Sequence, residues 1–191
     1  MKERMMLGLT VLILVSFFAF IYFASKKERG PYYVYQEGFG QWTIPKELFD
    51  YVRTSVPEGA TIVELGSGWS SEELSKYYSV YSVEHDPVWM NRYKTQYIYA
   101  PLKNGWYDSE QLKRHLPSSY EVLIVDGPDK AHREGLLEHL DLFLPRVKMI
   151  INNTQDAEGK ALLESVARKR NASFLVYDAQ DGRQFGVIAT Q

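Results

Sequence analysis

The sequence contains no cysteine. A disulfide framework, a thiol nucleophile and a thiolate metal site are therefore excluded, and the redox compartment stays open. Any metal would have to bind oxygen or imidazole ligands. Positive charge is not in excess either, because 22 Lys and Arg residues stand against 24 Asp and Glu residues, for a formal net charge of -2. A basic stripe that could neutralise a phosphate backbone is not expected, so nucleic acid is not a predicted partner.

The composition suits one domain with a short appendage. The chain has 191 residues, of which 45% are hydrophobic and 14% aromatic, enough for a proper hydrophobic core. Neither an internal repeat nor a low-complexity tract interrupts the sequence. We expect residues 31–191 to form this domain and residues 1–30 to form a membrane anchor with its flanks.

The anchor is predicted from the segment Leu7–Ala24, LGLTVLILVSFFAFIYFA, which carries no charge and has Lys and Arg residues on both sides. At a rise of about 1.5 Å per residue, a helix of this length just spans a hydrocarbon core of about 30 Å. It is therefore predicted to be a single transmembrane helix. A cleaved signal peptide is the alternative, but cleavage after Ala24 would leave Tyr22 at a position that requires a small residue.

The orientation of the anchor is predicted from two further patterns. Positive charge is slightly denser after the apolar segment than before it, which favours a cytoplasmic domain. The strings NNT at Asn152 and NAS at Asn171 match the acceptor pattern for N-glycosylation. Asn152 lies at the end of a predicted strand, where a ligand site of an α/β protein is expected and where a bulky glycan would block it. We therefore expect a single-pass membrane protein whose domain lies in the cytoplasm.

Short runs rich in β-branched and aromatic residues alternate with helical patterns from residue 45 onward. The predicted strands are Thr61–Leu65, Val80–Glu84, Tyr97–Ala100, Val122–Asp126, Val147–Ile151, Ser173–Ala179 and Gln184–Thr190. The predicted helices are Pro45–Val56, Glu72–Tyr78, Val88–Tyr93, Ser109–His115, Arg133–Phe143 and Ala157–Arg170. This alternation predicts the α/β class, with a doubly wound, mainly parallel, Rossmann-like sheet covered on both faces. Because only QDGR separates the last two strands, they should form a hairpin, which makes the C-terminal strand antiparallel.

The first predicted strand leads into the turn Gly66-Ser67-Gly68, and Glu64 stands just before it. In an open α/β sheet the ligand binds beyond the carboxyl ends of the strands, where a glycine-rich turn lets the backbone approach it closely. A second acid, Glu84, ends the next predicted strand. A carboxylate at that place can accept two charge-assisted hydrogen bonds from the hydroxyls of a ribose. These residues predict a cofactor that contains a ribose.

The residues around the turn separate two classes of such cofactors. A dinucleotide site favours G-x-G-x-x-G, but here Ser71 stands in place of the third glycine, and Glu64 would repel a pyrophosphate. A carboxylate beside the turn instead attracts a cofactor with a positive centre and an amino-acid tail, such as S-adenosylmethionine. The turn therefore favours S-adenosylmethionine over a dinucleotide.

The motifs VELGSGWSS, VEHD and VLIVDGP, in this order and at predicted strand ends, resemble those of the class I S-adenosylmethionine-dependent methyltransferases. The resemblance covers nearly the whole of the predicted domain. It implies that S-adenosylmethionine is the cofactor, with its methionine part lined by Glu64, Gly66, Ser67 and Gly68. It also implies that Glu84 holds the ribose and that His85 flanks the adenosine.

Some of these residues have simpler alternatives, and one expected feature is missing. Glu64 could be a buried acid satisfied by backbone N–H groups, and His85 could be only a polar residue at a strand end. The segment YIYAPL after the third predicted strand has no acid or amide that could read the adenine amino group. Adenine recognition would then fall to the backbone or to an aromatic side chain, for which Trp89 is a candidate.

The acceptor side is predicted from VLIVDGPDKAHREG, where Asp126 ends a strand. In the related small-molecule O-methyltransferases, an acid at this point and an Asp-Asn pair after the next strand hold a divalent cation. Here Asn152 and Asn153 replace that pair, so a metal is possible but not favoured. By a metal-free route, Asp126 would face the acceptor and His132 or Lys130 would take its proton. For each of the last two, a solvated loop is the alternative.

The sequence therefore predicts a membrane-anchored methyltransferase that acts on a hydroxyl of a small molecule or a glycan. A membrane-anchored glycosyltransferase is a second hypothesis, in which EHD would carry a metal-bound nucleotide sugar, although the glycine turn and the early acid argue against it. A third hypothesis is a non-catalytic module that keeps the fold, since Asn152 stands where the related enzymes have an acid. Binding of the cofactor would separate the three.

Overall fold

The computed structural model describes residues 43–189. The predicted membrane helix Leu7–Ala24 and the first part of the predicted domain lie outside these residues. Within 43–189, no helix combines the length and the apolar character needed to cross a bilayer. The membrane anchor therefore stays a prediction.

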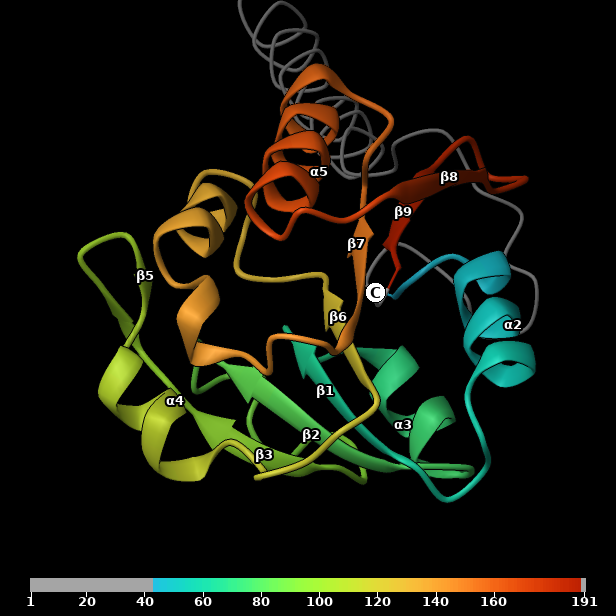
Figure 1. Cartoon of the computed structure of the whole chain (residues 1–191). Coiled ribbons are helices and arrows are strands. Elements are labelled where there is room, and N and C mark those ends of the chain that lie inside the picture. The colour runs from blue at the N-terminus through green and yellow to red at the C-terminus, as the bar shows by residue number, and fades with distance from the viewer. Residues whose placement is uncertain (1–42, 190–191) are drawn as a thin grey trace, which may run out of the picture. The chain divides into compact units, whose positions relative to one another are not determined.

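The described residues form an α/β fold (Figure 1). The strands are β1 (Thr61–Leu65), β2 (Ser79–Glu84), β3 (Gln96–Tyr99), β4 (Leu102–Lys103), β5 (Trp106–Tyr107), β6 (Val122–Val125), β7 (Lys148–Asn152), β8 (Phe174–Asp178) and β9 (Gln184–Ile188). The helices are α2 (Lys46–Ser55), α3 (Trp69–Ser75), α4 (Ser109–His115) and α5 (Ala157–Lys169), with the 3-10 segments η1 (Arg133–Glu138) and η2 (Leu140–Leu142).

Seven strands form one sheet in the order β3-β2-β1-β6-β7-β9-β8. The first five of these pair in parallel, and β9 pairs antiparallel with both β7 and β8. The predicted mainly parallel sheet with an antiparallel C-terminal strand is therefore confirmed. After β1 the chain continues to β2 on one side, and it later returns to β6 on the other side of β1. The carboxyl ends of β1 and β6 thus form the topological switch point, where open α/β sheets bind their ligands.

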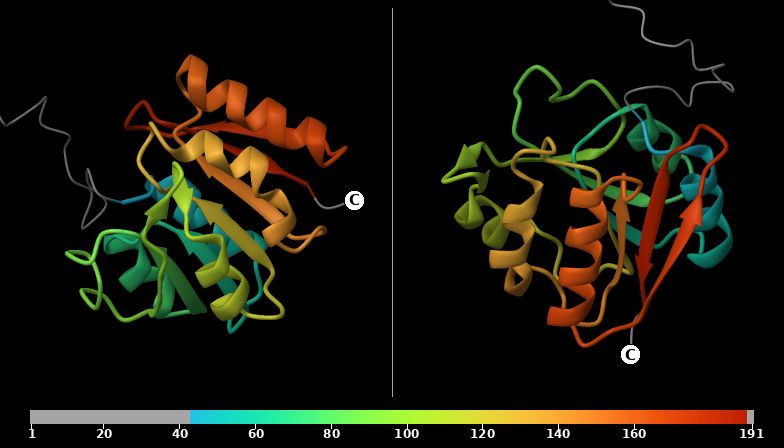
Figure 2. Two further views of the ribbon diagram at one scale, coloured as in Figure 1. Left: turned by 90° about the vertical axis from the view of Figure 1, so that its left-hand side faces the viewer. Right: turned by 90° about the horizontal axis from the view of Figure 1, so that it is seen from above.

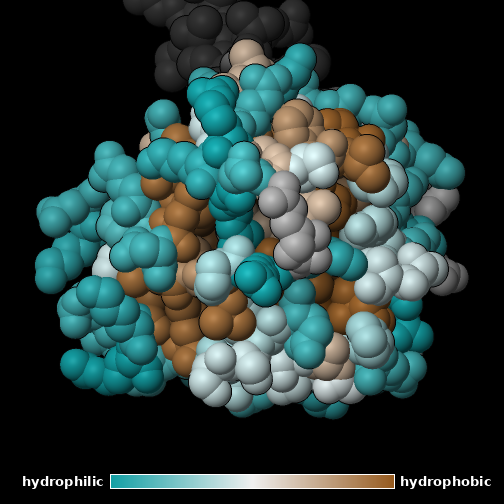
Figure 3. Space-filling view, in the orientation of Figure 1, coloured by the Kyte–Doolittle hydropathy of each residue, from teal (hydrophilic) through white to brown (hydrophobic). Residues whose placement is uncertain are grey.

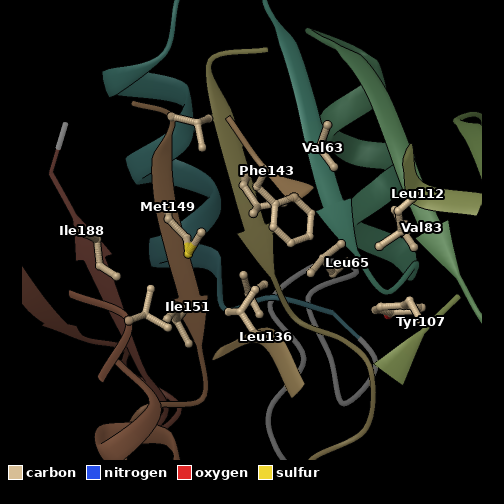
Figure 4. Close-up of a cluster of buried hydrophobic side chains, with 14 of the residues drawn as sticks. Val63, Leu65, Val83, Tyr107, Leu112, Leu136, Phe143, Met149, Ile151 and Ile188 are labelled. Carbon is tan, nitrogen blue, oxygen red and sulfur yellow. The ribbon is translucent and has the colours of Figure 1, made fainter. Parts of the chain in front are cut away.

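Helices cover both faces of the sheet (Figure 2), because alternate side chains of each strand point to opposite faces. On one face, α4, η1 and α5 pack on a core that includes Leu65, Val125 and Ile151 (Figure 4). On the other face, α2 and α3 pack on a core that includes Ile62 and Ile124. Burial of one such side chain contributes about 1.5–3 kcal/mol, so each face stabilises the sheet strongly.

The last helix lies unusually close to the sheet because two glycines allow it. A Cβ at Gly159 in α5 would lie 2.1 Å from the carbonyl oxygen of Asn153, and one at Gly186 in β9 would lie 2.3 Å from Cδ2 of Leu163. The helix begins at Asp156, whose carboxylate accepts a hydrogen bond from the N–H of Gly159 at 2.9 Å. The N-terminus of α5 is thereby fixed against the end of β7.

Two sequence predictions need correction, and one element was missed. The predicted helix Val88–Tyr93 is wrong: the segment forms turns, because Asp86 accepts a hydrogen bond from Val88 N at 2.9 Å and Asn91 adopts a left-handed φ of 59°. The predicted helix Arg133–Phe143 forms only the two short 3-10 segments. The β4–β5 hairpin was not predicted.

Hydrophilic and hydrophobic residues are unevenly distributed over the surface. Figure 3, in the orientation of Figure 1, shows hydrophilic residues over most of this face and a hydrophobic strip over the η1–η2 segment. Partly buried leucines of this segment and of the residues just after it pack against the core, namely Leu137, Leu140, Leu142 and Leu144.

Candidate functional site

The turns after β1 and β6 touch each other through two glycines. Gly66 has a φ of 88°, and a Cβ on it would lie 3.0 Å from the nitrogen of Gly127. A Cβ on Gly127 would lie 2.5 Å from the hydroxyl oxygen of Tyr107 and 2.9 Å from Cα of Gly66. Neither position accepts a side chain without movement of the backbone. The close contact therefore explains why residue 66 is a glycine. Gly127 is the second glycine of this contact at the switch point.

Glu84 ties the glycine turn to the end of β2. One carboxylate oxygen accepts hydrogen bonds from the backbone N–H of Ser67 at 3.0 Å and from its hydroxyl at 2.8 Å. The other oxygen accepts from the backbone N–H groups of His85 at 2.8 Å and Asp86 at 3.1 Å. An ionised carboxylate offers about four acceptor positions, so protein donors fill all of them. The side chain is buried, with 3% of its surface exposed.

Glu64 is the second buried acid, and its exposed fraction is 2%. Its carboxylate accepts a hydrogen bond from the hydroxyl of Ser82. Burial raises the pKa of Glu64 to about 7, hydrogen bonds from Ser71 and Ser82 oppose the rise, and the charges of Asp126 and Glu84 add to it. The donors to Glu64 are thus side-chain hydroxyls rather than the backbone N–H groups of the simpler alternative.

Glu64, Glu84 and Asp126 come from neighbouring strand ends and point to the same face of the sheet, since they alternate with residues of the α4–α5 core. Within residues 43–189, none of the three forms an ion pair with Lys or Arg; Glu84 has only the His85 Nδ1 atom 3.2 Å away. Glu64 and Glu84 are buried and Asp126 is half-buried, and buried carboxylates without a positive partner are costly. The cluster therefore favours a ligand that carries positive charge.

His85 lies at the rim of this cluster, with 27% of its side chain exposed. Its ring stands edge-on to Tyr107 at 5.9 Å between centroids. The aromatic ring beside His85 is thus that of Tyr107. Trp89 has Arg92 over its ring at 4.6 Å, and its part in adenine recognition stays a prediction. The Tyr107 hydroxyl is buried and has no hydrogen-bond partner among the described residues, and burial first, then the charge of Glu84, raises its pKa. It therefore stays a hydrogen-bond donor.

Asp126 and Asn152 join the ends of β6 and β7. The Nδ2 atom of Asn152 donates a hydrogen bond to Oδ1 of Asp126 at 2.7 Å. Arg133 binds the same two strand ends through carbonyl oxygens, donating to those of Asp126 and of Asn152, the latter at 3.2 Å, and to that of Pro128 at 3.3 Å. Sequence reasoning gave Arg133 no role, because contacts to carbonyl groups leave no pattern in the sequence.

The two predicted bases lie on the exposed loop after β6. Lys130 forms ion pairs with Asp156 at 2.8 Å and Glu158 at 3.0 Å. The hydrogen bond to Asp156, followed by that to Glu158, raises the pKa of Lys130, so its amine stays protonated and is a poor base. His132 pairs its Nδ1 atom with Asp129 at 2.8 Å, an arrangement that suits proton transfer at its other nitrogen.

The donor set for a metal is weak. Asn152 turns its amide nitrogen, which cannot ligate a cation, towards Asp126. Among residues 43–189, no three His, Asp or Glu side chains gather in a way that could hold a metal ion. The possible divalent metal therefore finds no support from the donors at the ends of β6 and β7, and the metal-free route stays a prediction.

A cleft of about 600 Å³ opens between η1 and α5. Apolar side chains in it include Leu137 and Leu162, and polar ones include Arg133, Asn153 and Ser165. Arg133 and Asn153 connect it to the strand ends, since Arg133 Nη1 lies 3.5 Å from Oδ1 of Asn153. The cleft thus adjoins the chain that follows β6 and β7, and neither Asp126 nor the glycine turn lines it.

These features define a Rossmann-like α/β fold with a candidate ligand site at its switch point, and solved structures with this fold are known. The precorrin-6y C5,15-methyltransferase from Geobacter metallireducens shares 9% identity over 84% of this chain and 94% of the other, with a TM-score of 0.56. The O-methyltransferase from Bacillus cereus, in complex with S-adenosylhomocysteine (SAH), shares 13% identity over 76% of this chain and 80% of the other, with a TM-score of 0.52.

A third similar structure is larger. The MycE methyltransferase of the mycinamycin biosynthetic pathway, in complex with Mg, SAH and mycinamycin VI, shares 13% identity over 76% of this chain, with a TM-score of 0.50. The present chain spans only 49% of that protein. No protein-family model and no curated protein sequence matches the chain. The described residues therefore have the fold of the class I S-adenosylmethionine-dependent methyltransferases, as the motifs predicted.

Proposed function

We propose that the protein is an S-adenosylmethionine-dependent methyltransferase that methylates a hydroxyl group of a small molecule or a glycan. The observation that carries the proposal is the pair of buried acids Glu64 and Glu84, which lie at the switch point without a Lys or Arg partner among residues 43–189. S-adenosylmethionine has a sulfonium and an ammonium group that would balance this charge. Two of the similar structures hold SAH, which supports the choice of ligand.

The residues present fit this cofactor. The contact between Gly66 and Gly127 leaves backbone, without side chains, at the place where a ligand would approach. Glu64 would face the positive methionine part, and Glu84 would accept from the ribose. The half-buried His85 ring, which packs edge-on against the buried Tyr107, offers aromatic surface beside Glu84. When bound, S-adenosylmethionine supplies an electrophilic methyl group.

The acceptor side of the proposal rests on Asp126. Its Oδ1 atom is fixed by Asn152 at 2.7 Å, which orients the carboxylate at the strand end. Asp126 would hold the acceptor hydroxyl in line for displacement at carbon, where positioning supplies much of the rate. The proton would go to Asp126 or to His132, since Lys130 stays protonated.

The proposal places the domain on a membrane. The uncharged segment Leu7–Ala24 and the positive charges that follow it support a single anchor with the domain in the cytoplasm. S-adenosylmethionine is made in the cytosol, so this orientation gives the site access to its cofactor.

Calorimetry of the full chain in detergent tests the cofactor. We expect binding of SAH, and weak or no binding of NAD and UDP-glucose. Glu84→Ala should weaken SAH by about 1.5–3 kcal/mol, the range for hydrogen bonds to a charged group. Glu138→Ala, at an exposed acid, is the matched control. Tight binding of NAD or UDP-glucose by the parent would contradict the proposal, and in the second case would favour the glycosyltransferase.

A second variant separates binding from chemistry. Asp126→Asn should keep SAH affinity nearly unchanged but abolish methyl transfer, because Asp126 acts on the acceptor rather than on the ribose. Transfer of radioactive methyl from S-adenosylmethionine to candidate acceptors measures the activity. A parent that binds SAH and methylates none of a broad panel of hydroxyl acceptors would favour the non-catalytic module.

A further inference from the structure

In the described conformation, the Glu84 carboxylate can accept a hydrogen bond from a ribose hydroxyl only if it loses one of its present hydrogen-bond donors. Its two oxygens accept from three backbone N–H groups and from one hydroxyl, that of Ser67. The three N–H groups belong to the turns after β1 and β2, and they cannot leave unless those turns unfold. The Ser67 hydroxyl can leave by rotation about one side-chain bond. It is therefore the donor that a ligand would displace.

The displaced hydroxyl has a second partner close by. The hydroxyl of Tyr97, in β3, is within hydrogen-bonding reach of the Ser67 side chain; this contact lowers the pKa of Tyr97, although burial raises it by more. The Tyr97 oxygen also accepts from the backbone N–H of Tyr93 at 3.3 Å, which holds it in place. Ser67 can thus exchange Glu84 for Tyr97 without leaving its hydroxyl unpaired.

We propose that Ser67 is a positioning residue with two states, bonded to Glu84 in the ligand-free protein and to Tyr97 when the cofactor is bound. The inference rests on the proposed function, because the displacing group is a donor on S-adenosylmethionine, either a ribose hydroxyl or the ammonium group. In the ligand-free state Ser67 keeps the buried carboxylate fully bonded. When the ligand binds, the Ser67 hydroxyl leaves Glu84, so part of the ligand's binding free energy offsets the loss of that hydrogen bond.

Removal of the Ser67 hydroxyl should change SAH affinity in one direction if Ser67 competes with the cofactor, and in the opposite direction if Ser67 contacts the cofactor directly. If Ser67 competes with the ligand, Ser67→Ala removes the competitor and should tighten SAH about two- to tenfold, the range for one hydrogen bond. If the Ser67 hydroxyl contacted the methionine part, as the sequence resemblance implied, the same variant would weaken SAH. Ser119→Ala, at an exposed serine, is the matched control.

Tyr97→Phe tests the second state. It removes the partner of the displaced hydroxyl, so SAH should weaken about two- to tenfold in the parent background. In the Ser67→Ala background, Tyr97→Phe should have no further effect, because no hydroxyl then needs a partner. Such coupling in a double-mutant cycle is not expected of two residues that only support the fold.

Calorimetry of the full chain in detergent, with melting temperatures to confirm folding, measures these affinities with SAH and with methylthioadenosine. A gain from Ser67→Ala with both ligands assigns the displacement to the ribose; a gain with SAH alone assigns it to the ammonium group. Weaker or unchanged SAH binding by Ser67→Ala overturns the inference and leaves the proposed function standing. A parent that does not bind SAH overturns both.

Discussion

Glu64 is a buried acid whose protonation differs between the folded and the unfolded chain. Burial raises its pKa from 4.5 to about 7, so between these values the folded protein keeps a proton that the unfolded chain has released. The resulting contribution to stability is full below about pH 4.5 and is lost as the pH rises through about 7. A neutral side chain at position 64 would not lose this contribution to stability as the pH rises.

Glu64→Gln should therefore stabilise the ligand-free protein at pH 8 by up to about 3 kcal/mol, and change it little at pH 5. Urea denaturation at the two pH values measures the difference, and Glu138→Gln serves as the exposed control. The same variant should weaken SAH at pH 8, since the negative charge that would face the ligand is gone. Equal stability of parent and variant at pH 8 would show that Glu64 is not buried as a charge.

Asn152 gives a second prediction at the residue scale. Its amide donates to Asp126 at 2.7 Å, so Asn152→Asp would place two carboxylates side by side. Like charges at this distance repel, and a hard cation such as magnesium would relieve the repulsion through oxygen ligands. We expect a lower melting temperature at pH 8 that magnesium restores, whereas the parent and Asn171→Asp respond little to magnesium. Parent activity that chelators abolish would refute the metal-free route.

At the scale of elements, the N-terminus of α5 packs tightly against the chain that follows β7. Gly159→Ala would bring a Cβ to within 2.1 Å of the Asn153 carbonyl oxygen, so helix and strand end must separate. In an ordinary helix this change stabilises by roughly 1 kcal/mol; here we expect a loss of about 1–3 kcal/mol, the range for overpacking. Lys160→Ala, exposed on the same helix, is the control. Thermal denaturation decides, and a more stable Gly159→Ala protein would contradict the packing described.

The elements differ in how well the sequence predicted them. Strands β1, β2, β6 and β7 were predicted almost to the residue, because short apolar runs bounded by turn residues have few other uses in an α/β protein. The β4–β5 hairpin carried a readable signal that was not used, the pair Asn104-Gly105, whose φ angles of 55° and 80° suit a two-residue hairpin turn. The segment Arg133–Phe143 has a helical pattern, but it forms two 3-10 turns, and nothing in the sequence pattern distinguishes the two outcomes.

At the scale of the whole molecule, the sequence predicted the acids of the site better than their partners. Glu64, Glu84 and Asp126 end parallel strands, and parallel strands bring such ends to one edge. The roles of Arg133 and Tyr107 depend on contacts between segments far apart in the chain: Arg133 on carbonyl groups of β7, Tyr107 on the turn at Gly127. No local pattern encodes such contacts, and the cleft between η1 and α5 has the same origin.

The last prediction concerns the side of the membrane on which the domain lies, and the two N-glycosylation strings provide a way to test it. Asn152 is 1% exposed and bonded to Asp126, so a folded domain cannot accept a glycan there. Asn171 is exposed and follows α5, so it can report whether the domain has entered a secretory lumen. The full chain should therefore be inserted into sealed microsomes and tested for protease access and for sugar on Asn171.

We expect protease added outside the vesicles to digest the domain, and glycosidase to leave the mass of the chain unchanged, because the positive charges after Leu7–Ala24 keep the domain on the cytoplasmic side. Vesicles opened with detergent control for intrinsic resistance to protease, and Asn171→Gln controls for the site of any sugar. A domain that resists protease until detergent is added, and that carries sugar on Asn171 but not in Asn171→Gln, would reverse the orientation. The site would then face a compartment into which S-adenosylmethionine must be transported.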